Sequence, residues 1–296
     1  MNLKDYLEEK RNMVDKALEE FLPPATSYPS IIHEAMRYSV FAGGKRLRPI
    51  LVITAAEIIG QEISLVMPTA SAMELIHTFS LIHDDLPSID NDDYRRGKPT
   101  CHRVYGDAVA ILTGDALLNY SFELMARNGQ YPGIKSEAVL SVMEEVSKAI
   151  GTEGMLGGEV VDIIFEGETG TEELVEYIHT HKTAALIKVS LRAGAILADS
   201  SSQEIQALSD YGDYLGFAFQ IQDDILNIEG DVKNLGKPVG TDSNRKKVTY
   251  PAIVGIENAH QKVKLLTQQA KQCLMIFGER GEVLIQLADY LSERKV

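Results

Sequence analysis

The sequence has few cysteines, and their positions exclude the usual structural roles of that residue. Only Cys101 and Cys273 occur among 296 residues. They lie far apart and form neither a CxxC pair nor a Cys/His pattern with zinc-ligand spacing. We therefore expect both to be small, largely buried, reduced thiols, without a structural disulfide.

A long uncharged apolar run is also lacking. No stretch approaches the roughly 18 uncharged apolar residues of a membrane span. The first twenty residues are charged and amphipathic, without the apolar centre of a signal peptide. These features predict a soluble, cytoplasmic protein without an integral membrane segment.

Positive charge is scarce relative to negative charge. The chain has 29 Lys and Arg against 43 Asp and Glu, a formal net charge of -14, and shows no basic patch interleaved with aromatic residues. Because nucleic acids are polyanions, this balance argues against nucleic acid as a partner. Small anionic substrates remain compatible where local Lys and Arg, or a metal, outweigh the overall field.

Strand-like alternation bounded by hairpin turns is rare. Apolar residues instead recur at helical spacing over residues 3–21, 50–59, 70–82, 138–150 and 205–226. Several of these segments are apolar around most of their circumference, which is typical of central helices. We predict one all-α domain over residues 1–296, a bundle of roughly ten or more helices.

Two acidic clusters each end an apolar helical segment: 84–90, which reads DDLPSID, and 223–227, which reads DDILN. Adjacent carboxylates repel one another, and a hard divalent cation such as Mg²⁺ relieves that repulsion through oxygen ligands. Helical spacing places His77 and Ser80 on the face of Asp84. Pro87 should end regular helix and let Asp90 return toward Asp84.

Clustered cations accompany the acidic residues. Residues 43–49 read GGKRLRP, and Arg95 and Arg96 follow the first acidic cluster. Arg binds phosphate in a bidentate manner, whereas the spacing of a P-loop is absent. Gln220 lies one helical turn before the second cluster. His179 and His181 lack metal-ligand spacing and are expected at the surface.

Several motifs resemble those of the short-chain trans-isoprenyl diphosphate synthases, and most closely the bacterial farnesyl diphosphate synthases. In order, they are GGKRLRP, HTFSLIHDDLPSIDNDDYRRGKPT, LTGDALL, GGEVVD, HKTAAL, FQIQDDILN, LGKPVGTD and KKVTYP. The resemblance implies the all-α isoprenoid synthase fold with a central cavity, a homodimer, and roughly three Mg²⁺ per active site, with Mn²⁺ as a possible substitute.

The same resemblance assigns roles position by position. The implied metal ligands are Asp84, Asp85, Asp90 and Asp223, and the implied catalytic set adds Asp224, Lys182, Thr183 and Gln220. The isopentenyl diphosphate site would consist of Gly44, Lys45, Arg48, His77 and Arg96. The allylic diphosphate contacts would be Arg95, Lys182, Thr183, Gln220, Lys237 and Lys247.

The implied reaction ionises an allylic diphosphate and adds isopentenyl diphosphate to the resulting cation, followed by proton loss. Phe79 and Ser80 would set the chain length, and the aromatic Phe79 favours farnesyl diphosphate. Asn227, where farnesyl enzymes more usually have Asp, leaves a geranylgeranyl product open. A catalytically weak regulatory subunit and a class I terpene cyclase are alternatives, disfavoured by the two intact aspartate pairs and by the isopentenyl site, respectively.

Two further departures from the family pattern concern charge. Glu159 stands where Gln is more usual, and the sequence alone offers no account of this carboxylate. Arg294 and Lys295 at the C-terminus could cover the isopentenyl site, although a frayed terminus is the expectation we favour.

Overall fold

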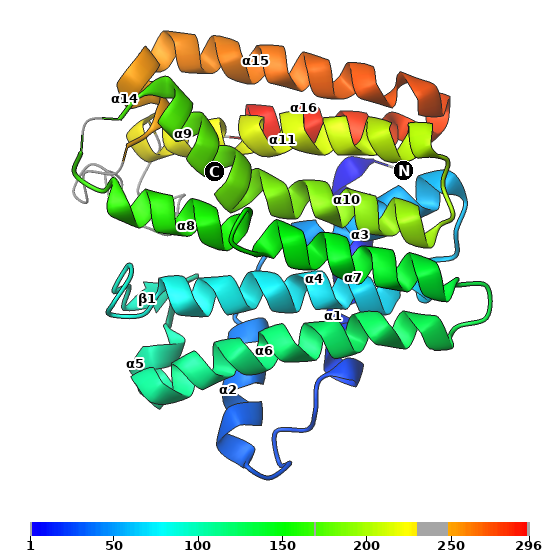
Figure 1. Cartoon of the computed structure of the whole chain (residues 1–296), viewed down its shortest axis with the longest axis vertical. Helices are drawn as coiled ribbons and strands as arrows, with labels where there is room; N and C mark the ends of the chain where they lie inside the picture. Colours follow the sequence, from blue (N-terminus) through cyan, green and yellow to red (C-terminus); the bar gives the residue numbers. More distant parts are fainter. Residues whose placement is uncertain (1, 169, 230–247, 295–296) are drawn as a thin grey trace. The chain divides into compact units, whose positions relative to one another are not determined.

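A computed structural model describes residues 2–168, 170–229 and 248–294 of the chain. This part is helical apart from one short hairpin, which confirms the predicted all-α class (Figure 1). It forms two compact units: unit 1 comprises Met1–Glu57 and Gln61–Met143, and unit 2 comprises Ile58–Gly60 and Glu144–Val296. The predicted single domain remains a prediction.

Unit 1 begins with three helices and is centred on a fourth. Its elements are α1 (Leu3–Phe21), α2 (Ser30–Val40), α3 (Leu47–Ile59), α4 (Ile63–Asp84), β1 (Tyr94–Arg95), β2 (Lys98–Pro99), α5 (Cys101–Tyr105), α6 (Asp107–Arg127), η1 (Asn128–Gln130) and α7 (Ser136–Ile150). The last residues of α3 and of α7 belong to unit 2.

Helix α4 is the core helix of unit 1 and runs beside α6 (Figure 1). It is apolar around most of its circumference, because neighbours pack on several sides of it. Among the described helices, it alone has the length and composition of a membrane span, but 78% of its most apolar window is buried within the protein. Core packing therefore accounts for its apolar character.

Unit 2 is built on the long helix α11. Its elements are α8 (Met155–Ile164), α9 (Glu172–Ile178), the π-helical turn η2 (His179–Ala184), α10 (Ala185–Leu197), α11 (Ser202–Glu229), α14 (Tyr250–Val254), α15 (Ile256–Cys273), η3 (Leu274–Gly281) and α16 (Glu282–Glu293).

A hydrophobic cluster joins α9, α11, α14 and α15. Val175, Phe217, Ile221, Tyr250 and Val263 are among its buried members. Burial of side chains of this size contributes about 1.5–3 kcal/mol each. The cluster therefore fixes the C-terminal half of α11, which carries the second acidic pair, against its neighbours.

Candidate functional site

The first acidic cluster lies where α4 ends. Asp84 is the last residue of the helix and Asp85 follows as its C-cap. The Asp90 backbone N–H donates to the Asp84 carbonyl at 2.8 Å, so the chain does return after Pro87. On α4, His77, Ser80 and Asp84 are partly exposed. This spacing of seven residues places them on one helix face, as predicted.

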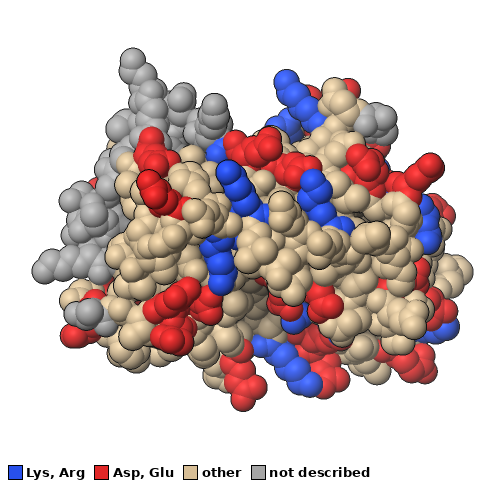
Figure 2. Space-filling model, turned by 90° about the horizontal axis from the view of Figure 1, so that it is seen from above, with Lys and Arg blue, Asp and Glu red and all other residues tan. Residues whose placement is uncertain are grey.

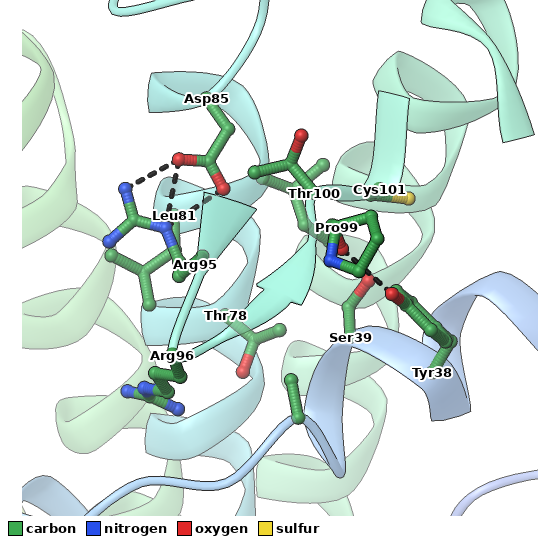
Figure 3. A pocket seen from close by; sticks show the side chains of 12 residues that line it. Tyr38, Ser39, Thr78, Leu81, Asp85, Arg95, Arg96, Pro99, Thr100 and Cys101 are labelled. Carbon is green, nitrogen blue, oxygen red and sulfur yellow. Dashed lines mark hydrogen bonds and ion pairs between the residues drawn. The ribbon is translucent and has the colours of Figure 1, made fainter. Parts of the chain in front are cut away.

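Arg95 forms a bidentate ion pair with the buried Asp85. Its Nε lies 2.8 Å from each carboxylate oxygen, and its Nη2 lies 2.5 Å from Oδ1. Figure 3 shows this pair at a pocket that is also lined by Thr78, Thr100 and Cys101. The buried Cys101 thiol is free, as predicted, and so is the partly buried Cys273.

A tight hairpin presents the two arginines. Tyr94 pairs with Pro99 and Arg95 with Lys98, so residues 96 and 97 form the turn. Arg96 has φ 52° and Gly97 has φ 76°, the left-handed pair of a two-residue hairpin. The hairpin directs Arg95 toward Asp85, while Arg96 lies farther along it (Figure 3).

The glycine-rich segment 43–49 receives Arg96. A Cβ atom at Gly44 would lie 2.5 Å from Arg96 Nη1, and Arg96 donates to the Gly43 carbonyl. Glycine at 44 therefore lets the guanidinium approach the backbone. Nearby, Lys45 is exposed and Arg48 is partly buried.

Arg46 of the same segment has a structural role. Its buried guanidinium contacts Asp15 and Glu74, each at 2.7 Å, and donates to the Val40 carbonyl at 2.8 Å. Of the three cations between Gly44 and Pro49, this one holds the loop in place. Lys45 and Arg48 are the two cations of this segment that the resemblance assigns to the isopentenyl diphosphate site.

The electrostatic field around His77 is strongly positive. The protein packed around its imidazole removes water from the ring and lowers its pKa well below the ordinary value, and the charges of Arg48, Arg96, Arg95 and Arg46 lower it further. A neutral histidine among arginines can donate a hydrogen bond to phosphate without adding charge. The grouping marks this end of unit 1 as suited to an anion.

Phe79 packs inside unit 1. It is 3% exposed, and its ring meets the His83 ring edge-on at 5.2 Å between centroids. The His83 ring in turn lies over Gly114 of α6, where a Cβ atom would come within 2.2 Å of Nε2. The neighbouring Ser80 donates its hydroxyl to the His77 carbonyl at 3.0 Å.

The two aspartates of the second cluster have different surroundings. Asp224 is buried and accepts from the Tyr250 backbone N–H at 2.9 Å and from Gln220 Nε2 at 3.3 Å. Asp223 is partly exposed and pairs with Arg294. Asp224 is therefore hydrogen-bonded inside the protein, while Asp223 pairs with the guanidinium of Arg294.

The expectation of a frayed end is wrong for Arg294, which makes defined contacts with α11. Lys295, the other residue of that expectation, lies outside the described residues. The Arg294 guanidinium lies over the Phe219 ring, 4.2 Å from the centroid. Its backbone carbonyl also accepts from Gln222 Nε2 at 3.2 Å. Cation–π and ion-pair contacts together hold the end of the described chain against α11.

Lys182 is bound between two carboxylates of α8. Its Nζ lies 2.6 Å from Glu159 and 2.7 Å from Asp162. A Cβ atom at Gly158 would lie 2.6 Å from the Lys182 backbone nitrogen, so this glycine of the GGEVVD motif allows the π-helical turn to approach α8. The unusual Glu159 is thus an ion-pair partner of Lys182.

Thr183 and Gln220 contact each other directly. The Thr183 hydroxyl donates to Gln220 Oε1 at 2.8 Å. Because Gln220 Nε2 donates to Asp224, the three side chains form a continuous polar chain from the π-helical turn to α11. The structure thus brings together three residues that the sequence resemblance places in one catalytic set.

The expectation that His179 lies at the surface is wrong. His179 is 5% exposed, and its Nε2 lies 3.3 Å from Asp224 Oδ2. Residue spacing carries no signal of this contact, because the π-helical turn that contains His179 breaks the usual helical spacing. His181, partly exposed and stacked on Tyr177, fits the expectation better.

Some expected features lie beyond what the structure describes. Lys237 and Lys247 fall outside the described residues. Within the described residues, no three His, Cys, Asp or Glu side chains converge as a metal-binding group. Figure 2 shows, on one face, acidic side chains interspersed among basic ones.

Comparison with known proteins now defines the class. A model of the polyprenyl synthetase family matches residues 29–276. The chain is 40% identical to the geranylgeranyl diphosphate synthase of Cyanophora paradoxa, covering 99% of this chain and 97% of that one. It is 40% identical to the farnesyl diphosphate synthase of Geobacillus stearothermophilus, covering 99% and 98%.

Solved structures give the same result. Geranylgeranyl pyrophosphate synthetase from Pyrococcus horikoshii superposes with a TM-score of 0.89 at 33% identity, over 99% of this chain and 98% of that one. The protein is an all-α prenyltransferase. More particularly, it belongs to the polyprenyl synthetase family. Relatives with farnesyl and with geranylgeranyl names both occur, so the family alone does not define the length of the product.

Proposed function

We propose that the protein condenses isopentenyl diphosphate with dimethylallyl or geranyl diphosphate, giving farnesyl diphosphate and pyrophosphate. The observation that carries the proposal is the arrangement at the end of α4. There the carboxylate of Asp85 is paired with Arg95, and His77 lies in the field of Arg48 and Arg96. Carboxylates for a metal beside cations for phosphate are what a diphosphate substrate requires.

The donor set fits Mg²⁺. Asp85 and Asp223 each hold a guanidinium in this structure, so both carboxylates already accommodate a cation. Asp84, Asp85, Asp90 and Asp223 are the proposed ligands, all with oxygen donors of the kind that Mg²⁺ prefers. Bound Mg²⁺, or Mn²⁺ in its place, would stabilise negative charge on the departing pyrophosphate.

The residues of the chain have distinct tasks in this reaction. Arg95, Lys182 and Gln220 would orient the allylic diphosphate, so that its carbon–oxygen bond breaks and pyrophosphate leaves. Gly44, Lys45, Arg48, His77 and Arg96 would hold isopentenyl diphosphate, whose double bond attacks the cation. Thr183 would lie beside that cation, and pyrophosphate would accept the proton. Lys237 and Lys247 complete the allylic set by resemblance only.

Phe79 supports the farnesyl product. A buried aromatic ring one to two helical turns from Asp84 occupies space that a longer prenyl tail would need. Geranylgeranyl diphosphate is the second candidate, favoured by Asn227 and by the names of several similar proteins, among them the one from Cyanophora paradoxa. The small Ser80 beside Phe79 leaves that option open.

A cytoplasmic homodimer is part of the proposal and rests on the resemblance. Helix α6 exposes Ile111 and Leu112, apolar side chains that a second copy could cover. A similar Arabidopsis thaliana protein is named a large subunit of a heterodimeric synthase, so the identity of the partner needs measurement. Sedimentation analysis of the purified protein would show a dimer if the proposal holds, and a monomer would contradict it.

The test is incubation of purified protein with isopentenyl diphosphate and either dimethylallyl or geranyl diphosphate, with Mg²⁺ or with EDTA. Prenyl products are then identified by mass spectrometry. Farnesyl diphosphate formed only with Mg²⁺ supports the proposal, and a C20 product would select the second candidate. Absence of any product would contradict the proposal that the protein is an active synthase and would favour a regulatory subunit.

A further inference from the structure

The surroundings of Asp224 differ from those of a metal ligand. Its carboxylate is 5% exposed. It accepts from Gln220 Nε2 of α11 and from the Tyr250 backbone N–H at the start of α14, and it lies 3.3 Å from His179 Nε2 of the π-helical turn. A buried carboxylate needs such partners to offset its loss of hydration. Asp224 therefore joins three segments of unit 2 through one side chain.

His179 is the third of these partners of Asp224, and it is itself buried. Its ring is 5% exposed and meets the Phe217 ring edge-on at 6.0 Å. Its Nδ1 is buried and has no hydrogen-bond partner among the described residues. The contact of Nε2 with Asp224 is thus the polar contact that accounts for a histidine at this buried position.

The contact reaches the substrate-binding residues through Gln220. Because Asp224 accepts from Gln220 Nε2, the amide must present Oε1 to the Thr183 hydroxyl. Thr183 is four residues after His179 in the same turn. His179 therefore contacts Asp224 directly, and Thr183, near the other end of the turn, is linked to Asp224 through Gln220.

Close packing leaves this turn little room to adjust. A Cβ atom at Gly216 of α11 would lie 2.5 Å from the Ala184 Cβ, and one at Gly158 of α8 would lie 2.6 Å from the Lys182 nitrogen. Turns of the π type are uncommon and are often found at functional sites. Here the extra residue in the turn brings His179 to Asp224 while Lys182 faces the carboxylates of α8.

We propose that His179 is a positioning residue for the allylic half of the reaction. It acts through Asp224 to fix the Gln220 amide and the Thr183 hydroxyl, and it does not itself touch the substrate. This inference rests on the proposed function, in which Gln220 and Thr183 contact the allylic substrate.

The kinetic test compares two substitutions. His179→Leu removes the ring nitrogen, whereas His179→Gln places an amide nitrogen close to the position of Nε2. We expect His179→Leu to lower kcat/KM for the allylic diphosphate about tenfold, as for loss of a polar contact to a buried charged group. The KM for isopentenyl diphosphate should be unchanged, and His179→Gln should recover most of the loss.

The matched control is His260→Leu on α15, where the histidine is 44% exposed and contacts Glu229; its kinetics should equal those of the unaltered protein. Equal losses in the Leu and Gln variants, or equal increases in both KM values, would overturn the inference. If His179→Leu does not fold, Asp224→Asn tests the same contact and should give the same loss confined to the allylic substrate.

A second measurement separates this inference from the proposed function. Hydrogen–deuterium exchange of the peptide covering residues 176–185 requires no turnover. We expect faster exchange in His179→Leu than in the unaltered protein, with His179→Gln between them. Unchanged exchange in His179→Leu would overturn the inference even in a protein that forms prenyl product, whereas absence of product with the expected exchange would count against the proposed function alone.

Discussion

Lys182 and Glu159 form an ion pair in which Nζ lies 2.6 Å from a carboxylate oxygen. Both side chains are mostly buried, and Asp162 contacts the same ammonium at 2.7 Å. Two carboxylates offset more of the positive charge of the Lys182 ammonium than one carboxylate would. The allylic diphosphate therefore meets a weaker positive field at Lys182 than it would without Glu159. We therefore predict that Glu159→Gln lowers the KM for the allylic diphosphate about threefold, as for a weak ion pair.

The control for this change is Glu166→Gln, at an exposed glutamate just after α8. It removes the same charge without touching Lys182 and should leave the KM unaltered. A higher KM in Glu159→Gln than in the unaltered protein would show that Glu159 assists Lys182 instead.

Phe79→Ala should lengthen the product. Removal of the ring opens space within unit 1 where the ring now packs against His83, and longer prenyl chains should follow. Chromatography of the dephosphorylated products measures the change. Phe277→Ala is the control, since Phe277 is equally buried at 3% in unit 2. Both variants should lose about 3 kcal/mol of stability, but Phe277→Ala should keep the product length; unchanged products in Phe79→Ala would contradict the assignment.

The pKa of His77 gives a prediction about pH. That pKa lies well below the ordinary value in the folded protein, so the unfolded chain binds the proton first as pH falls. Stability should therefore decrease as pH drops below about 6.5, by at most about 1.4 kcal/mol for each pH unit from this one group. Denaturant unfolding at several pH values measures the slope, and His77→Gln should make it shallower.

Ligand binding should act on the same group. A diphosphate offsets the charge of Arg48 and Arg96, so isopentenyl diphosphate should raise the pKa of His77 toward its ordinary value. Nuclear magnetic resonance of the imidazole protons follows this titration, and assignment uses the His77→Gln spectrum. A pKa that does not respond to isopentenyl diphosphate would place that substrate elsewhere.

Arg294→Gln should reduce the Mg²⁺ concentration needed for half-maximal activity. Arg294 pairs with Asp223, a proposed metal ligand, and the metal must compete with this guanidinium. We expect a decrease of about threefold, the size of a weak ion pair. Arg280→Gln is a control on an exposed arginine that instead donates to the Ile58 carbonyl, and it should leave the metal requirement unchanged.

The sequence predicted the helices well, because apolar residues recur at the spacing that places them on the buried face of a helix. Residues 205–226 lie within α11, and 70–82 lie within α4. The start of α4 was less evident, because Pro68 falls inside that helix and proline usually marks a helix end. The return of Asp90 to Asp84 followed correctly from Pro87.

Site residues were predictable where they lie within one contiguous motif. They were less predictable where a contact between distant parts of the sequence determines the partner of a side chain. Arg95 was expected near the first acidic cluster, because it lies only ten positions after Asp85 in the sequence. The pairing of Glu159 with Lys182, and that of Arg294 with Asp223, join residues 23 and 71 positions apart respectively, beyond the reach of local spacing. His179 was misplaced because a π-helical turn shifts side chains off the ordinary helical face.

The central claim is that carboxylates of both clusters serve a Mg²⁺-dependent transfer to isopentenyl diphosphate. It is tested most directly by product formation as a function of Mg²⁺ concentration for the unaltered protein, Asp84→Ala and Asp223→Ala, with helical content checked by circular dichroism. We predict Mg²⁺-dependent prenyl product from the unaltered protein, and no measurable turnover from either variant at unchanged helical content. Near-normal turnover in either variant, or product in the presence of EDTA, would contradict the account.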